Sequence, residues 1–357
     1  MKKISLILTA ILTAGVVFTG CGNKSNTQSK VVEQNKEPRT LVISTWGYNE
    51  DKLRKNVFES FEKENNVKIV LEVGNNAERL NKIKNMSNSK IDIIYLADSF
   101  SMEGIKAGLF EKVNKDNIPN LKNIYDVAKA TSADGYGPAY TINRTGIIYD
   151  SKAVSKPLES WKDLWQAELK GKITVSEITS TAGPALIAAA ANIAGTTIEK
   201  DYNKAFVEMV KLKPNIVKTY SKSSDLVNMF TQGEIVAGVA QDFAFGQIKA
   251  ALPSAKWLDP KEGAYANLNT INIVKGSKNK ELAEKFIDWS LSEKVQKANA
   301  LDKIDSPVNV NVVLTEKEAE GLTYGKEIIA GLKTLDLNYI NSVKTKWIDK
   351  WNKEISN

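Results

Sequence analysis

The sequence predicts an α/β fold built as two lobes with a cleft between them. Apolar strand patterns alternate with amphipathic helical patterns in two stretches of the chain, before and after about residue 140. Such alternation favours a mostly parallel sheet covered by helices on both faces. The length of 357 residues suggests two domains, and the content of 42% hydrophobic and 25% charged residues is that of a globular protein.

The amino terminus has the pattern of a secretory signal. Lys2 and Lys3 precede an apolar run over 4–18 that is too short to span a bilayer. Gly20-Cys21 then resembles a bacterial lipobox, with Phe18 where leucine is usual. We therefore expect a signal peptide over 1–20, and a lipidated Cys21 with a flexible polar tether over 21–39. The acyl chains would hold the protein on the outer face of the cytoplasmic membrane, the periplasmic side if an outer membrane exists.

Composition removes several kinds of chemistry. The chain has one cysteine and no histidine, which excludes disulfides and every catalytic or metal site that needs either residue in the mature chain. No cofactor and no metal site is expected. The net charge of +7 falls to +5 once Lys2 and Lys3 are removed, and the charges are interspersed. Without a dense basic block, nucleic acid is not an expected partner.

The first α/β set begins with an apolar strand over 40–46. The residues Leu53, Val57, Phe58 and Phe61 recur at helical spacing within 52–65. The set continues with strands at 67–72 and 91–96 and helices at 77–86 and 102–107.

The second set follows a break at Gly135 to Tyr140 and an extended run over 141–149. Ser160 and Asp163 form a capping-box pattern that leads into a helix. Strands are then expected at 173–175, 216–217 and 235–239, and helices at 184–194, 201–212 and 224–230.

The order of short motifs is similar to one family, the extracellular solute-binding proteins of ABC importers, and closest to its spermidine/putrescine-binding type. The resemblance covers about 40–315 and rests on the order of Trp46-Gly47-Tyr48, Ile91-Asp92-Ile93-Ile94, Ile147-Ile148-Tyr149-Asp150, Ser160-Trp161-Lys162-Asp163-Leu164-Trp165, Gly233-Glu234-Ile235 and Asn279-Lys280-Glu281-Leu282-Ala283. It implies a periplasmic-binding-protein-like (type II) fold that closes around a small-molecule solute. It also implies a monomer without enzyme activity, and delivery to ABC permease subunits with a separate ATPase.

The same resemblance implies where the lobes divide. Strands would cross between them near 140–147 and 269–274. Lobe 1 would be 40–142 plus 270–312, and lobe 2 would be 143–269 plus 313–357. Near the carboxyl terminus, apolar residues recur at helical spacing from Ile340 to Trp351, which indicates core packing more than a ligand site.

Ligands of open α/β sheets bind beyond the carboxyl ends of the strands. A polyamine would need carboxylates for its ammonium groups and aromatic rings for its methylenes. The candidate ligand-binding residues in such loops are Trp46, Tyr48, Asp98, Ser99, Arg144, Glu177, Thr179, Ser180, Thr181, Asp242, Tyr265, Asn267 and Asn269, with Asn143 and Gln241 in the same loops. For each acid, a solvated carboxylate or a helix cap is the alternative.

Two departures from the family favour an anion instead. Asn267 and Asn269 stand where the family has an aromatic residue and an aspartate, and a neutral amide holds a buried ammonium poorly. Arg144, with the turn from Thr179 to Gly183 at a helix start, could hold a phosphonate, a sugar phosphate or a carboxylate. The alternatives are an interlobe salt bridge for Arg144 and simple helix capping for the turn.

Two further classes of function stay open from the sequence. An anchored enzyme could use paired carboxylates, although no acid lies in a recognisable catalytic motif. An anchored sensor or adhesin could have kept the binding fold. Ferric ion is disfavoured as the solute, because the chain lacks the paired tyrosines of iron-binding relatives and contains no histidine.

Overall fold

The computed structural model describes residues 37–86, 90–129 and 134–356. Pro38–Asn357 forms one compact unit, separate from Met1–Glu37. The expected signal peptide, Cys21 and nearly all of the tether therefore lie outside the described residues. Within the described ranges, no helix combines the length and the apolar character needed to cross a bilayer.

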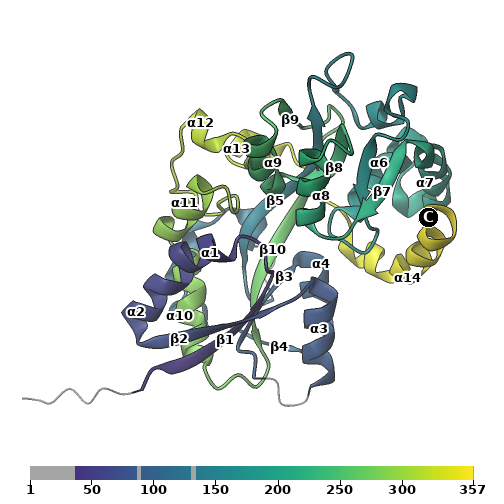
Figure 1. Ribbon diagram of the computed structural model, residues 1–357. Coiled ribbons are helices and arrows are strands. Elements are labelled where there is room, and N and C mark those ends of the chain that lie inside the picture. Colours follow the sequence, from purple (N-terminus) through teal and green to yellow (C-terminus); the bar gives the residue numbers. More distant parts are fainter. Residues whose placement is uncertain (1–36, 87–89, 130–133, 357) are drawn as a thin grey trace, which may run out of the picture. The chain divides into compact units, whose positions relative to one another are not determined.

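Ten strands form one mixed sheet, whose main path runs β2-β1-β3-β10-β5-β8-β6-β7, with β4 paired to β10 and β9 to β5 (Figure 1). The strands are β1 (Arg39–Thr45), β2 (Val67–Val73), β3 (Ile93–Ala97), β4 (Phe110–Glu111), β5 (Ala139–Asp150), β6 (Ile173–Ser176), β7 (Ile216–Tyr220), β8 (Ala237–Gln241), β9 (Ala255–Leu258) and β10 (Tyr265–Val274).

The two central strands join two parallel sets. β1 pairs in parallel with β2 and β3, and β6 pairs in parallel with β7 and β8, as the alternating pattern predicts. β5 and β10 pair antiparallel with each other and with the adjoining strand of each set. All of β5 except Asp150 is buried, because it has neighbours on both edges and helices over its faces. The predicted α/β fold class is confirmed.

The helices cover both sets of strands. They are α1 (Glu50–Leu53), α2 (Glu59–Asn65), α3 (Asn76–Asn85), α4 (Asp98–Lys106), α5 (Asp126–Lys129), α6 (Gly183–Ile193), α7 (Ile198–Leu212), α8 (Ser223–Thr231), α9 (Phe245–Ala251), α10 (Lys280–Ser290), α11 (Glu293–Leu301), α12 (Glu316–Ala319), α13 (Lys326–Ala330) and α14 (Leu337–Glu354). A π-helical turn at Arg54–Phe58 links α1 to α2, so the expected helix over 52–65 is continuous.

Local sequence chemistry sets several helix ends. Gly195 follows α6 at φ 72°, a conformation that glycine adopts without steric cost. The Ser160–Asp163 capping box is present, but it begins only a short 3₁₀ helix over Trp161–Trp165. Asn75 and Glu78 form a further capping box at the start of α3.

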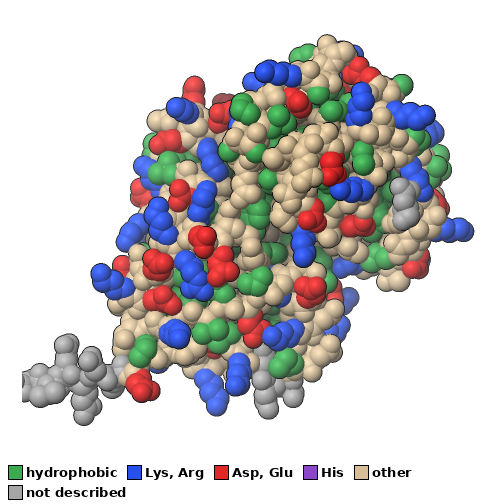
Figure 2. Space-filling model, in the orientation of Figure 1, with side chains coloured by type: hydrophobic (Ala, Val, Ile, Leu, Met, Phe, Trp, Pro, Cys, Tyr) green, Lys and Arg blue, Asp and Glu red, His purple; other side chains and the backbone are tan. Residues whose placement is uncertain are grey.

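Two large hydrophobic cores lie on either side of the central strands. One packs β1 and β3 against α2 and α10, around Phe58, Phe61 and Phe286. The other packs β6 and β8 against α6, α7 and α14, and includes Trp347 and Trp351. The predicted packing role of the last helix is thus confirmed. Figure 2 shows acidic and basic side chains interspersed over the visible surface, as the sequence indicates.

Candidate functional site

A cleft enclosing about 600 Å³, open solvent included, lies where four segments meet. It is lined from α4 by 98–100, from the start of α6 by 178–181 and Pro184, from β10 by Ala266 and Asn267, and from the last segment by residues between Leu335 and Ile348. Six of the sequence-predicted residues line it, namely Asp98, Ser99, Thr179, Ser180, Thr181 and Asn267. The enclosed part of the cleft is narrow, with room for about 40 Å³ of water-sized volume. Its walls combine apolar and polar groups, as the walls of small-molecule sites do.

Asp98 supplies the carboxylate of the cleft. It follows β3 directly and opens α4, where its Oδ1 accepts the Ser99 N–H at 2.8 Å. Because β10 runs antiparallel beside β3, the Leu268 N–H also reaches Asp98 Oδ2, at 3.3 Å. Burial nevertheless raises the pKa of Asp98 to about 6, against the opposing effect of these backbone donors. The carboxylate is therefore ionised at neutral pH and incompletely solvated, which suits it to hold a cation.

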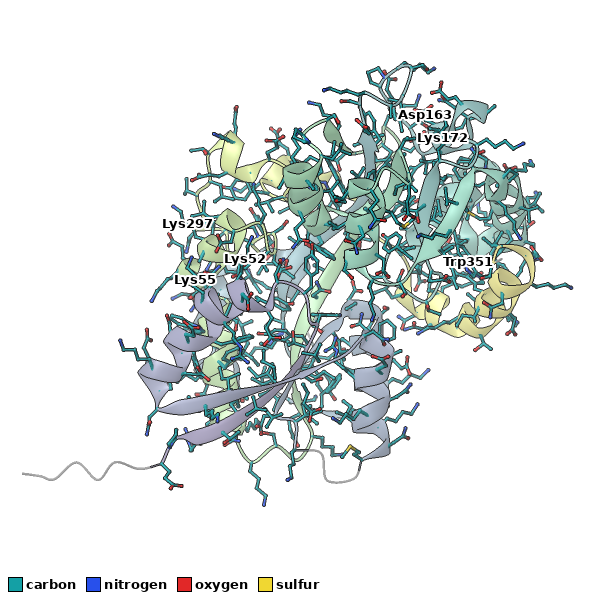
Figure 3. The ribbon with its side chains drawn as sticks, viewed as in Figure 1. Lys52, Lys55, Asp163, Lys172, Lys297 and Trp351 are labelled. Carbon is teal, nitrogen blue, oxygen red and sulfur yellow. The ribbon has the colours of Figure 1, made fainter. Side chains whose placement is uncertain are left out.

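A second wall of the cleft is the turn that leads into α6. Thr179, Ser180 and Thr181 line the cleft, and the Ser180 hydroxyl donates to the Glu177 carbonyl at 2.7 Å. The predicted site residue Glu177 is not among the lining residues. Its carboxylate accepts from the Thr219 hydroxyl and, at 3.2 Å, from Nε1 of Trp351, which α14 presents (Figure 3). Glu177 thus ties α14 to the second set of strands.

Helix α14 forms a third wall that the sequence did not predict. Asn341 donates from Nδ2 to the Ser99 carbonyl at 3.2 Å. Lys344 lies over the ring of Phe100, with its Nζ 4.2 Å from the centroid and 4.0 Å from Glu103 Oε2. Ile340, Trp347 and Ile348, predicted to pack, line the cleft as well as the core. The available sequence clue was that Asn341, Lys344 and Ile348 share one face of the helix.

Unpartnered amide groups lie beside the cleft. Asn143 on β5 is directly opposite Asn267 on β10, which places the two side chains on the same face of the sheet. The Asn267 Oδ1 accepts from the Thr145 hydroxyl at 2.5 Å. Asn143 is 0% exposed, and neither of its amide atoms has a protein partner. Since buried amides are normally hydrogen-bonded, Asn143 points to a bound polar molecule or water at this face.

Arg144 lies apart from the cleft lining, in a cluster that is buried except for Asp259 and that we call the Arg144 cluster (Arg144, Asp242, Asp259, Ser306 and Thr323). Its guanidinium donates to Asp259 Oδ1 at 2.5 Å and Oδ2 at 3.1 Å, and to the Thr323 hydroxyl at 3.0 Å. It is also 3.5 Å from Asp242 Oδ2. Arg144 therefore forms salt bridges, but its partners Asp242 and Asp259 lie with it within 143–269, so these are not the interlobe bridge that the sequence analysis offered as the alternative. Asp242 is 1% exposed, and burial raises its pKa to about 6 although Arg144 opposes the shift.

Asp305, which the sequence analysis did not single out, adjoins this cluster. Burial, with Asp242 as the second cause, raises the pKa of Asp305 to about 8. The predicted site residue Tyr48 lies near it, since Asp305 contributes to the raised pKa of the tyrosine after burial. The Tyr48 hydroxyl is buried without a partner, and its ring meets Phe243 edge-on at 5.5 Å.

The other three predicted residues hold structural positions outside the cleft lining. Trp46 stacks under the Arg79 guanidinium, whose Cζ is 4.5 Å from the ring centroid. Tyr265 is buried beside Trp161 and accepts a hydrogen bond from Asn192 at 3.1 Å. Asn269 pairs with Ala97 and Thr141 at a bulge in β10. In the described ranges, no group of three or more acidic or sulfur-bearing residues is arranged to hold a metal ion.

The fold and the cleft agree with a family comparison. Residues 56–322 match the family model described as bacterial extracellular solute-binding protein. The chain belongs to this family. The resemblance and the function class that the sequence predicted, an extracellular protein that binds a small-molecule solute, are therefore confirmed. The family is defined by solute binding for transport.

Known relatives extend the comparison. A crystal structure of an ABC transporter from Clostridium perfringens ATCC 13124 is 51% identical, covers 88% of this chain and 100% of that one, and superposes with a TM-score of 0.76. The putrescine-binding periplasmic protein PotF of Escherichia coli K12 is 27% identical over 87% of this chain and 90% of its own length. The spermidine/putrescine-binding periplasmic protein of Salmonella typhimurium is 26% identical over 68% and 70%, respectively.

Proposed function

We propose that this chain is the solute receptor of an ABC importer for a small organic amine, with the polyamines bound by its named relatives as the first candidates. The observation that carries the proposal is Asp98, an ionised and poorly solvated carboxylate in the wall of a cleft that is lined by six of the predicted site residues. The ammonium group of a solute would supply the positive partner that the Asp98 carboxylate lacks. Release to separate permease and ATPase subunits would complete the cycle, without turnover of the solute.

Closure of two lobes around the solute is part of the proposal. Lobe 1 would be 40–142 plus 270–312 and lobe 2 would be 143–269 plus 313–357, with β5 and β10 as the connecting strands. In support, β5 and β10 stand between the two parallel sets of strands. Two hydrogen bonds in this structure, from Asn341 to the Ser99 carbonyl and from Gln247 to Asn49, would join the two lobes.

An anionic solute, the alternative that the sequence left open, has less support from the structure than an amine. It requires Arg144 to face the solute, and Arg144 is engaged by two carboxylates and a hydroxyl. The turn at Thr179–Thr181 does line the cleft, but Asp98 lines the same cleft. A carboxylate in the same cleft repels a solute whose only charge is negative.

Binding of an amine should appear directly in thermal unfolding of the chain from residue 38 onward, which forms one compact unit. We expect putrescine or spermidine to raise the unfolding midpoint. A ligand at about 1,000 times its Kd adds about 4 kcal/mol to the free energy of unfolding. Phosphate and glucose 6-phosphate serve as anion controls. A shift with the anions alone would contradict the proposal, and a shift with none of the amines would remove its support.

We also propose that the mature chain is a lipoprotein anchored through Cys21. The support is the apolar run that ends in Gly20-Cys21 and the polar stretch that follows it. In cells fed labelled palmitate, the full chain should carry the label and sediment with membranes. Cys21→Ala should abolish the label and leave the protein in the soluble or secreted fraction. Membrane attachment that survives Cys21→Ala would contradict a lipid anchor at this residue.

A further inference from the structure

The cleft holds two opposite charges that are not paired with each other. Asp98 is in the α4 wall, and Lys344 reaches the lining from α14. In the described part of the chain, no ion pair joins them, and the Asp98 carboxylate accepts from the backbone N–H groups of Ser99 and Leu268. Lys344 has one weak ion pair, 4.0 Å long, with Glu103. A solute with a single charge would leave one of these two groups uncompensated.

The surroundings of Lys344 favour an anion beside it. Burial lowers the pKa of Lys344, with Glu103 opposing the shift, so its ammonium group is short of compensating charge. The hydroxyl residues Thr179 and Thr181 line the same cleft and precede α6, an 11-residue helix whose positive dipole end begins at Gly183. These donors and the cation together form a wall suited to carboxylate oxygens.

Two buried polar side chains next to lining residues of the cleft have no hydrogen-bond partner. The Asn143 amide is fully buried, lies on the sheet face shared with the lining residue Asn267, and has no partner for either of its polar atoms. Ser176, at the end of β6 just before the 178–181 wall, likewise has a buried hydroxyl without a partner. A carboxylate and an ammonium group offer both acceptors and donors to such amide and hydroxyl groups.

We propose that the solute is zwitterionic, with an ammonium group held at Asp98 and a carboxylate held by Lys344 and the turn at Thr179–Thr181. The proposal rests on the proposed amine-receptor function and narrows its substrate class from diamines to amino acids with separated charges. Lys344 takes the role that the sequence assigned to Arg144.

Three four-carbon solutes that differ only in their end groups test this proposal. They are putrescine (two ammonium ends), 4-aminobutanoate (one of each) and butanedioate (two carboxylates). Calorimetric titration of the chain from residue 38 onward should give the tightest binding with 4-aminobutanoate, by about tenfold or more, because each misplaced end group sets like charges against each other. Tighter binding of putrescine would overturn the zwitterion and leave the amine receptor standing. Binding of butanedioate alone would overturn both, as would the absence of any binding.

Lys344→Met then separates recognition of the carboxylate from a purely structural contact between α14 and α4. We expect the variant to lose about tenfold in affinity for 4-aminobutanoate and to keep or gain affinity for putrescine. Lys346→Met, at an exposed position on the same helix, is the matched control and should match the wild type. Equal losses for both solutes in Lys344→Met would show that Lys344 only positions α14. Thermal unfolding of each ligand-free variant verifies that it is folded.

Discussion

Asp98→Asn should lower the affinity for the amine solute about 100-fold, which corresponds to about 2.8 kcal/mol. The substitution keeps the shape of the side chain and replaces the charge-assisted contact to the ammonium group by a neutral one. Calorimetric titration with the amine that binds the wild type measures the loss. Asp116→Asn, at an exposed position in the same half of the chain, is the control and should bind as the wild type does. An unchanged affinity in Asp98→Asn would place the ammonium group elsewhere.

The same residue predicts a pH dependence. Asp98 in the free protein has a pKa of about 6, and an ammonium group binds only its ionised form. The ionised fraction falls from about nine tenths near pH 7 to about one tenth near pH 5, so the affinity should fall about tenfold over that interval. The solute ammonium, with a pKa near 10, stays charged throughout. Asp98→Asn should abolish this dependence, and a dependence that survives in the variant would assign it to another group.

Arg144→Met should lower the free energy of unfolding by about 3 kcal/mol or more near neutral pH. The side chain of Asp242 is 0% exposed, and removal of Arg144 leaves that carboxylate buried without its cation. The loss corresponds to a midpoint lower by about 5 °C for a chain of this size. Thermal unfolding followed by circular dichroism measures it.

The pH dependence of this loss follows from the raised pKa of Asp242. In the folded protein, burial holds the pKa of Asp242 above its value in the unfolded chain, and removal of Arg144 raises the folded-state pKa further. The ionised Asp242 therefore destabilises the variant at pH values above the unfolded pKa, and this destabilisation grows as pH rises toward the folded-state pKa of the variant. The deficit of Arg144→Met should therefore shrink toward about pH 5, where Asp242 takes up a proton. Arg144→Met combined with Asp242→Asn should recover part of the stability. A deficit that is the same at both pH values and in the double variant would mean that lost packing, not the buried charge, causes it.

Much of the fold could be predicted from sequence because its determinants are local. The strand at 67–72 and the helix at 77–86 differ from β2 and α3 by one residue at each end at most. Local signals also fixed the start of α6, which brings Thr179–Thr181 to the cleft. Such periodicities and caps act over a few residues and can be recognised without knowledge of the fold.

The parts that sequence did not predict depend on contacts between distant segments. Asn341 is hydrogen-bonded to Ser99 although the two residues are 242 positions apart in the sequence. Nothing in the local sequence around either residue indicates that α14 lines the cleft. Arg144 has an unremarkable sequence context, and its role is decided by Asp259, Thr323 and Asp242 from three other segments. Trp46 and Tyr265 suit a ligand by residue type, and in this structure they lie against Arg79 and Trp161, outside the cleft lining.

Hydrogen exchange with and without solute tests most directly where this receptor binds. With 4-aminobutanoate or putrescine at saturation, the account predicts slower exchange of the backbone amides at 98–100, 179–183 and 341–348, which surround the cleft. Peptides around Lys55 and Lys63, far from the lining residues in sequence, should be unaffected. Protection confined to Tyr48, Arg144 and Asp242, with the cleft segments unchanged, would contradict the account and move the binding site to the Arg144 cluster.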